Sequence, residues 1–225
     1  MINNSSPEYI SARVLDDLGH QGWSFLSTDI DPADRSDIHE LFQVMNRTLA
    51  FDSTIQPETT TLAPRDHSRV LATTREAMSY HTDNVYLDNP CRTVALFCTV
   101  QAEEGGGNTL VDGIEAVRTL PEEMISELKL TQWRWMNPAT NTPSGEYAVI
   151  DESEERMRWW RMSLLSQKMA QVAVADAFEA ALDGSPTKRR VLMQPGDILV
   201  TDNSRIVHNR EAFSGARHLY RARFW

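Results

Sequence analysis

Short runs of apolar and β-branched residues, separated by turn-forming residues, recur along most of the chain and are typical of β-strands. They lie at residues 23–26, 77–83, 93–100, 109–111, 131–136, 147–150, 190–193, 198–201 and 218–225. Turn signals stand between them, as in GGGN at residues 105–108 and PGD at residues 195–197. The run over residues 93–100 is the most apolar, so we expect it at the centre of a sheet.

A helical period replaces this pattern in only a few segments. The first helix is expected to open at Pro7, with Ser5 or Ser6 as its N-cap, and to end at Gly22. A second is predicted to start at Asp31-Pro32, with the aspartate as cap, and to run to about Ala50. Further helices are predicted over residues 113–120, 121–130 and 166–182.

Residues 51–74 show neither period and are rich in Thr, Pro, Asp and Ser, which predicts a long loop that serves as a rim or lid. The chain thus combines many short strands with helices at its N-terminus and one long helix late in the sequence. This order favours a mainly β fold with flanking helices, a double-sheet barrel or jelly roll, over βαβ units. The length of 225 residues fits a single domain, in which residues 1–50 form a helix–strand–helix unit packed on the barrel.

Composition excludes several classes of partner. Apolar residues make up 41% and charged residues 24%, as in ordinary globular proteins, and the net charge is −10. This charge leaves no basic surplus to bind nucleic acid or an anionic membrane, although a small anion needs only one or two arginines. Cys91 and Cys98 form neither a disulfide framework nor a CxxC pair, which indicates a reduced cytoplasm. No signal peptide or membrane-spanning run is recognisable.

Candidate chemistry begins with His81 and Asp83, which point to the same face if they lie on one strand. Alone, the pair is equally explained by a buried histidine and an aspartate that caps the following turn. His208, from a distant strand, would complete a 2-His-1-carboxylate facial triad, which suits Fe(II) and leaves three coordination positions open. Zinc more often has three histidines or cysteine ligands. The other histidines, His20, His39, His67 and His218, lack such partners.

Arginines crowd the last predicted strand, where Arg217, Arg221 and Arg223 are spaced to share one face. Guanidinium groups placed so closely repel one another unless anions lie between them. One interpretation is surface salt bridges, which suits Arg223 near the end of the sequence. The other is that one arginine binds a carboxylate in a bidentate contact. Thr109 would add a hydroxyl donor, or it is an ordinary strand threonine.

Four motifs together carry a family resemblance: HTD at residues 81–83, GGGNT at 105–109, PGD at 195–197 and DNSRIVHNREAFSGARHLYR at 202–221. They resemble the Fe(II)/2-oxoglutarate-dependent oxygenases, in particular the branch of taurine dioxygenase, clavaminate synthase and carbapenem synthase. The resemblance runs from about residue 75 to the end, and the carboxy-terminal block is its most specific part.

The resemblance implies a double-stranded β-helix, the cupin-like jelly roll. It implies that His81, Asp83 and His208 bind Fe(II), and that Arg217, helped by Thr109, pairs with the distal carboxylate of 2-oxoglutarate. Arg221 matches an arginine that lies near the cosubstrate or the substrate. Residues 137–165, where relatives carry variable lid or interface structure, match no pattern.

The activity that the resemblance implies is a dioxygenase that uses Fe(II), 2-oxoglutarate and O2 to oxidise an unactivated C–H bond of a small molecule. Hydroxylation is the simplest outcome, and desaturation or ring formation by the same chemistry stays open. We expect a free amino acid or related zwitterion of specialised metabolism, such as antibiotic biosynthesis. Arg69 and Arg75 would hold a substrate carboxylate, or they pair with surface acids.

Trp159-Trp160 would line a pocket, pack in the core or contact a second subunit of a homo-oligomer. Two alternatives of another class remain: a non-redox, metal- or sugar-binding cupin-type protein, and a metal-dependent hydrolase or isomerase with the same triad. Neither alternative gives Arg217 the role of a cosubstrate ligand.

Overall fold

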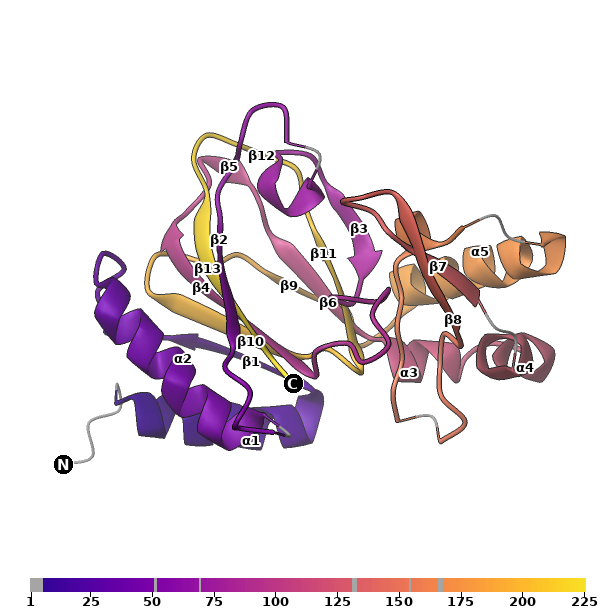
Figure 1. The fold of residues 1–225 in the computed structure, drawn as a ribbon, viewed down its shortest axis with the longest axis horizontal. Helices are drawn as coiled ribbons and strands as arrows, with labels where there is room; N and C mark the ends of the chain where they lie inside the picture. Colours follow the sequence, from indigo (N-terminus) through magenta and orange to yellow (C-terminus); the bar gives the residue numbers. More distant parts are fainter. Residues whose placement is uncertain (1–5, 51, 69, 131–132, 154, 166–167) are drawn as a thin grey trace.

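The computed structural model describes residues 6–50, 52–68, 70–130, 133–153, 155–165 and 168–225 (Figure 1). Its helices are α1 (Pro7–Gln21), α2 (Arg35–Leu49), α3 (Gly113–Val117), α4 (Glu122–Leu130) and α5 (Met169–Gly184), with 3-10 turns η1 (Leu71–Thr73) and η2 (Arg161–Ser163). Its strands are β1 (Trp23–Ser27), β2 (Glu58–Leu62), β3 (Met78–His81), β4 (Thr93–Val100), β5 (Glu104–Gly105), β6 (Asn108–Asp112), β7 (Trp133–Asn137), β8 (Thr142–Tyr147), β9 (Arg189–Val191), β10 (Asp197–Asp202), β11 (Ile206–Arg210), β12 (Phe213–Ser214) and β13 (His218–Phe224).

Two antiparallel sheets form the body of the molecule. The larger has the order β1-β10-β4-β13-β2, and the smaller has the order β3-β11-β6-β9. The apolar strand β4 lies at the centre of the larger sheet, as its sequence predicts. The prediction of a mainly β fold with flanking helices is therefore confirmed. In the described part of the chain, no strand pairing closes the two sheets into a barrel.

The core is divided into layers by the two sheets. Helices α1 and α2 cover the outer face of the larger sheet, and α3, α4 and α5 cover the outer face of the smaller one (Figure 1). Between the sheets, Leu110 and Ile206 of the smaller sheet meet Leu199 and Leu219 of the larger. Strand β13 sends Ala222 and Phe224 outward to the helices. Because successive strand residues face opposite sides, the intervening arginines point inward.

The predicted start of the first helix is confirmed. Ser6 accepts a hydrogen bond from the Tyr9 N–H, and Gly22 ends the helix at a positive φ of 78°. The second helix begins at Arg35 rather than at Pro32, so its predicted start is wrong. The reason is that Asp34, not Asp31, accepts the N–H groups at the helix start, whereas Asp31 holds the turn before it.

The apolar pattern missed several strands, namely β2, β8 and β11 and the two-residue strands β5 and β12. The stretch predicted as a loop over residues 51–74 contains β2, an edge strand that pairs with β13. Its sequence, ETTTL, has no apolar alternation because most of the strand is exposed. The strand predicted over residues 147–150 is misplaced, since the partner of β7 is β8, which ends at Tyr147. The sequence of β8, TPSGEY, is mostly polar and therefore shows no apolar alternation.

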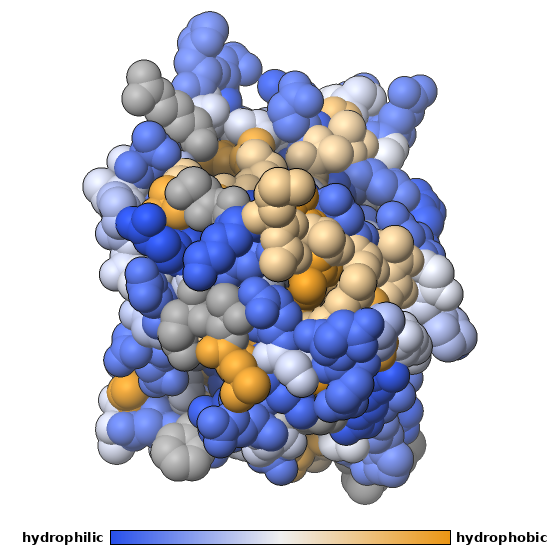
Figure 2. Space-filling view, turned by 90° about the vertical axis from the view of Figure 1, so that its right-hand side faces the viewer, coloured by the Kyte–Doolittle hydropathy of each residue, from blue (hydrophilic) through white to orange (hydrophobic). Residues whose placement is uncertain are grey.

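The end of the molecule that carries α4, α5 and the β7–β8 hairpin has an apolar patch among polar side chains (Figure 2). Leu130, Met169 and Val172 are exposed apolar residues of these helices. Across the described ranges, no helix combines the length and apolar character needed to cross a bilayer.

A substitution in the central strand β4 tests whether the N-terminal helices pack on the larger sheet. Phe97 is fully buried between β4 and the N-terminal helices. Its replacement by alanine leaves a cavity, so Phe97→Ala should lower the free energy of unfolding by about 3–5 kcal/mol. The half-exposed Leu15 provides the control, and Leu15→Ala should stay within about 0.5 kcal/mol of the wild type. Equal urea midpoints for the two variants would contradict the proposed layers.

Candidate metal and anion site

The structure brings His81, Asp83 and His208 together between the sheets. Strand β3 ends at His81, Asp83 follows just beyond it, and His208 of β11 stands opposite His81 in register. The Nε2 atoms of His81 and His208 lie 3.7 Å and 3.6 Å from Oδ1 of Asp83. Their ring centroids are 4.3 Å apart. In the described ranges, this is the one group of three or more His, Cys, Asp or Glu residues placed to share a metal ion.

The donor atoms of this cluster fit a divalent metal. Nδ1 of His81 lies 2.9 Å from the Ser79 carbonyl oxygen, and if that nitrogen carries the proton, Nε2 keeps its lone pair toward the cluster. Burial, and then the neighbouring His208, lower the pKa of His81 to about 3. A neutral imidazole and an ionised carboxylate are the forms that bind metal.

The second carboxylate oxygen of Asp83 is held by arginines of the opposite sheet. Oδ2 accepts hydrogen bonds from Nη1 of Arg221 at 3.1 Å and from Nε of Arg223 at 2.8 Å. Burial by itself raises the pKa of Asp83, but Arg221, the hydrogen bond from His208 and then Arg223 hold it well below its usual range. Asp83 therefore stays ionised, with one oxygen toward the histidines and the other toward the arginines.

Arg223 is not the surface residue that its position near the end of the sequence suggested. Its side chain is largely buried, and it also donates to Oε1 of Glu58 on β2 at 2.9 Å. The spacing of two residues between Arg221 and Arg223 could have indicated this burial, because it places both guanidinium groups on the inward face of β13.

Asn203 fixes the loop that carries Asp83; it belongs to the motif of residues 202–221, but no role was predicted for it. It lies in the turn between β10 and β11 and is fully buried. Its Oδ1 accepts the Asp83 N–H at 2.6 Å, and its Nδ2 donates to the carbonyls of Asp83 at 3.0 Å and Cys91 at 2.8 Å. The turn that precedes His208 is thus hydrogen-bonded to the backbone of Asp83, a second member of the cluster.

Arg217 is a buried cation whose guanidinium carbon lies 5.7 Å from the centre of the Phe213 ring. It is 6% exposed, and among the described residues no hydrogen-bond or ion-pair partner is found for it. Burial lowers its pKa to about 10, so it remains charged at neutral pH. It lines one cavity together with His81, Asp83 and His208. A buried charge without a partner is costly, so this position calls for an anionic ligand.

Gly106, just before β6, allows Arg217 to approach. At Gly106, where φ is 73°, an added Cβ would lie only 3.1 Å from Cδ of Arg217. By contrast, the neighbouring buried Arg210 is engaged, since it donates to backbone carbonyls that include those of Leu71 and Thr74.

Strand β6 presents Asn108 rather than Thr109 to this cavity. Asn108 lines it with His208 and Arg217, and its buried Nδ2 has no partner. Thr109 pairs with Asn209, whose Oδ1 accepts the Thr109 N–H at 3.1 Å. Alternation about the inward-facing Leu110 could have indicated Asn108. The predicted role of Thr109 stays a prediction.

Of the arginines predicted to bind substrate, Arg221 lies at the cluster and Arg75 does not. Arg75 is exposed, and its Nη1 lies 3.4 Å from Oδ1 of Asp66. It does not line the two cavities that contain His81. Arg69 lies outside the described residues. Of the two tryptophans, Trp159 packs edge-on against Phe178 at 4.8 Å, whereas the ring of Trp160 lies 5.5 Å from that of His81.

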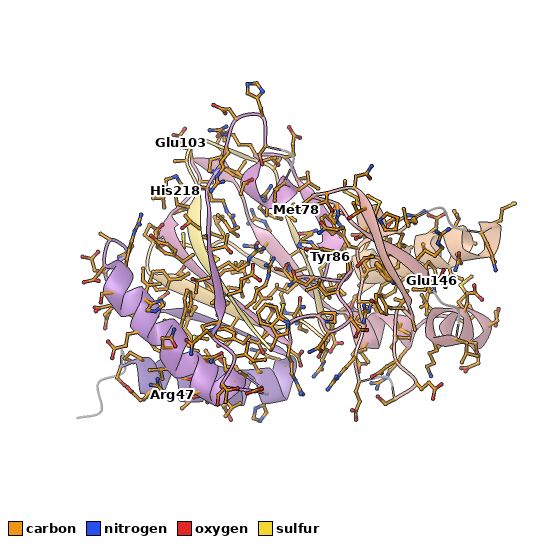
Figure 3. The ribbon with its side chains drawn as sticks, in the orientation of Figure 1. Arg47, Met78, Tyr86, Glu103, Glu146 and His218 are labelled. Carbon is orange, nitrogen blue, oxygen red and sulfur yellow. The ribbon has the colours of Figure 1, made fainter. Side chains whose placement is uncertain are left out.

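A second cavity of about 110 Å³ opens beside the cluster. Met78 and Tyr86 line it, and in Figure 3 both lie toward the middle of the molecule, away from Arg47 on α2. Its remaining lining residues are Val70, Leu71, Ala72, His81, Thr82, Asp83, Asn84, Asn137, Pro138, Ala139, Trp160, Arg221 and Arg223. A larger hollow of about 650 Å³ lies across the loop of residues 88–92 and does not contain the histidines.

Two antiparallel sheets that enclose a His-Asp-His set beside a buried, unpaired arginine define a class of metal-dependent protein with an anionic ligand. The family model described as "Taurine catabolism dioxygenase TauD, TfdA family" matches residues 2–223. The chain belongs to this family, and the resemblance inferred from its motifs is confirmed.

The curated relatives agree with this family. The chain is 31% identical over 134 residues to trimethyllysine dioxygenase of Neurospora crassa, a match that covers 51% of this chain and 28% of the relative. The mitochondrial trimethyllysine dioxygenase of Bos taurus is 26% identical over 168 residues, with coverages of 66% and 40%. The matches thus span less than half the length of these curated relatives.

An asparagine oxygenase in complex with Fe(II), 2S,3S-3-hydroxyasparagine and succinate is similar in fold. It has a TM-score of 0.80 at 14% identity, and the match covers 96% of this chain and 78% of the other. The non-heme iron oxygenase OrfP in complex with Fe and alpha-ketoglutaric acid has a TM-score of 0.72 at 17% identity, with coverages of 97% and 79%. At these identities the similarity establishes the fold alone.

The contacts of Asn203 predict a combined effect on stability and metal affinity. Asn203→Ala leaves buried backbone groups of Asp83 and Cys91 unpaired, each of which costs about 1–3 kcal/mol. It should also weaken Co(II) binding by roughly 10–100-fold, as loss of supporting contacts around metal ligands does. Urea unfolding and visible titration with Co(II) measure the two effects.

The exposed Gln56 supplies the control, and Gln56→Ala should change neither quantity. If Asn203→Ala is destabilised but binds Co(II) as the wild type does, Asn203 does not position Asp83.

Proposed function

We propose that the protein is an Fe(II)- and 2-oxoglutarate-dependent dioxygenase that hydroxylates a C–H bond of a free amino acid or related small zwitterion. The observation that carries this proposal is the buried, unpaired Arg217 in one cavity with the His-Asp-His cluster. A metal site alone needs no such cation, whereas a metal site that also receives a dicarboxylate does.

In this proposal, Nε2 of His81, Oδ1 of Asp83 and Nε2 of His208 would hold Fe(II). Arg217 would bind the distal carboxylate of 2-oxoglutarate, with the unpartnered Nδ2 of Asn108 as a neighbouring donor and Thr109 as the predicted hydroxyl. When bound, the iron and 2-oxoglutarate supply an O2-dependent oxidation that releases succinate and CO2.

The chain's own residues position and shield this chemistry. Arg221 and Arg223 hold Oδ2 of Asp83, so that Oδ1 faces the histidines. The apolar side chains of Leu62, Leu96 and Leu219 line the same cavity as Arg217 and reduce the water around the bound carboxylate. Arg221 stays divided between orienting Asp83 and contacting the ligands, since its Nε has no partner.

We further propose that the two sheets form a double-stranded β-helix, or jelly roll, within a single domain of residues 1–225. The structural similarity to iron oxygenases supports this architecture. Residues 137–165 would act as its lid, which is supported by Asn137 and Trp160 on the wall of the second cavity. A cytoplasmic location is supported by Cys91 and Cys98, both free and buried.

The amino-acid substrate is supported by the relatives' names, which include trimethyllysine dioxygenase and asparagine oxygenase, and by OrfP in complex with (3S)-hydroxy-L-Arg. A non-redox cupin or a hydrolase with the same triad gives the buried charge of Arg217 no partner. Desaturation and ring formation would use the same site.

The proposal is tested with purified protein that receives Fe(II) and 2-oxoglutarate under anaerobic conditions. We expect a weak visible charge-transfer band. It should disappear in Asp83→Ala, which loses a metal ligand, and require at least tenfold more 2-oxoglutarate in Arg217→Ala, since a charge-assisted contact contributes about 1.5–3 kcal/mol.

Arg13→Ala, an exposed change on α1, serves as the control and should give the wild-type titration. A flat spectrum in the wild type, with no 2-oxoglutarate-dependent succinate from any amino acid tried in air, rules out the oxygenase.

A further inference from the structure

We propose that Arg210 is a positioning residue, which holds the segment of residues 70–76 in place as the wall against which the substrate binds. The inference rests on the proposed function and deepens it, because it assigns a residue to the substrate side of the metal site. Arg210 acts through the backbone of this segment and not by contact with the substrate.

The first observation is the set of carbonyl groups that Arg210 gathers. Its Nη1 donates to the carbonyl of Ala72 at 3.3 Å, and its Nη2 donates to those of Leu71 at 3.3 Å and Thr74 at 3.0 Å. The carbonyl of Glu76 accepts a further hydrogen bond from Nη2. These acceptors follow one another along turn η1 and the residues after it, so one side chain fixes the course of the whole segment.

The second observation is the charge of Arg210. It is 6% exposed, and in the described part of the chain no acidic side chain pairs with it. Burial, and then the neighbouring Arg217, lower its pKa to about 10, so it remains charged at neutral pH. A buried cation has to be offset by hydrogen-bond acceptors, and here the carbonyl oxygens of the segment supply them. Moving the segment away would leave the guanidinium group buried without these acceptors.

The third observation is the place of the segment in the site. Val70, Leu71 and Ala72 line the cavity of about 110 Å³ together with His81. Ala72 also lines the cavity that contains Arg217. The segment thus borders the space beside the metal cluster, where a substrate next to the iron would lie.

Strand β11 connects this wall to the metal site. His208 and Arg210 are two residues apart on the strand, so their side chains share one face, and both line the cavity that contains Arg217. One strand face therefore carries both a metal ligand and the anchor of the wall.

The other described hydrogen bonds of the segment lie mostly within its own loop. Two reach beyond it: the Phe213 N–H donates to the Arg75 carbonyl at 3.1 Å, and Nε of Arg75 donates to the Gly215 carbonyl at 3.3 Å. Both are made at Arg75, which follows the part of the segment that lines the cavities. The position of that part therefore depends mainly on Arg210.

The test separates the carbonyl contacts of Arg210 from its charge. Arg210→Lys keeps the cation but replaces the fork of N–H donors by a compact ammonium group, which cannot serve the same set of carbonyls. Arg205→Lys is the matched control. Arg205 stands just before the same strand, donates to Oδ2 of Asp112, and lines neither of the two cavities that contain His81.

Hydrogen exchange of the full chain, loaded anaerobically with Fe(II) and 2-oxoglutarate, gives a readout that needs no substrate. The amides of Thr73 and Thr74 are bonded within turn η1 and should be protected in the wild type. In Arg210→Lys their exchange should be roughly 10–100-fold faster, because the lost contacts are hydrogen bonds to a charged group. The amide of Phe97 in β4 should exchange as in the wild type.

Calorimetry on the same loaded protein measures substrate affinity, with the proteinogenic L-amino acids as probes. For those that bind the wild type, Arg210→Lys should raise the dissociation constant roughly tenfold or more, because binding then has to order the wall. The 2-oxoglutarate titration of the charge-transfer band should stay as in the wild type, since the cation is kept. Arg205→Lys should match the wild type in all three measurements.

Unchanged exchange of Thr73 and Thr74, unchanged amino-acid affinity, or an equal loss of amino-acid and 2-oxoglutarate affinity in Arg210→Lys would each overturn the inference. So would equal acceleration at Phe97, no binding by any amino acid, or, should the variant not fold, unprotected Thr73 and Thr74 amides in the wild type. The charge-transfer band of the wild type tests the proposed function separately, so the inference can fail while the oxygenase proposal stands.

Discussion

The site depends on one buried carboxylate that is shared between two sheets. Asp83 presents one oxygen to His81 and His208 on the smaller sheet and the other to Arg221 and Arg223 on the larger. A buried charge is tolerated only where it is paired and hydrogen-bonded, and this carboxylate meets that condition from both sides. Without it, two buried guanidinium groups would face each other with no anion between them.

The surrounding structure serves this arrangement. The pairing of β3 with β11 sets the two histidines opposite each other, and Asn203 ties the loop of Asp83 to the turn before β11. Further along the same space, Arg217 adds a positive charge that no described residue balances. The inter-sheet space thus holds buried charged groups beside apolar side chains, which is the layout expected of a site that receives a metal and a dicarboxylate.

The sequence predicted those parts of the site that follow strand periodicity or family motifs. His81, Asp83, His208 and Arg217 fall in recognisable motifs, and the structure brings them together. Arg223 and Asn108 follow the same alternation. The position of Arg223 near the end of the sequence suggested a surface salt bridge, and the motif drew attention to Thr109 rather than to Asn108. Asn203 lies in one of these motifs, but its contacts with Asp83 could not be predicted, because they link positions that are distant in sequence.

The errors in the fold have the same kind of cause. Strand β2 is polar because it lies at an exposed edge, so no apolar pattern marks it. Two aspartates, Asp31 and Asp34, could cap helix α2, and only the folded backbone shows that Asp34 is the N-cap.

The most direct measurement is a crystal structure of the protein loaded anaerobically with Fe(II) and 2-oxoglutarate, with the metal located by its anomalous scattering. The account predicts one iron coordinated by His81, Asp83 and His208, with Oδ2 of Asp83 still held by Arg221 and Arg223, and the distal carboxylate of 2-oxoglutarate on Arg217. Iron bound elsewhere, or 2-oxoglutarate that leaves Arg217 unpaired, would contradict it.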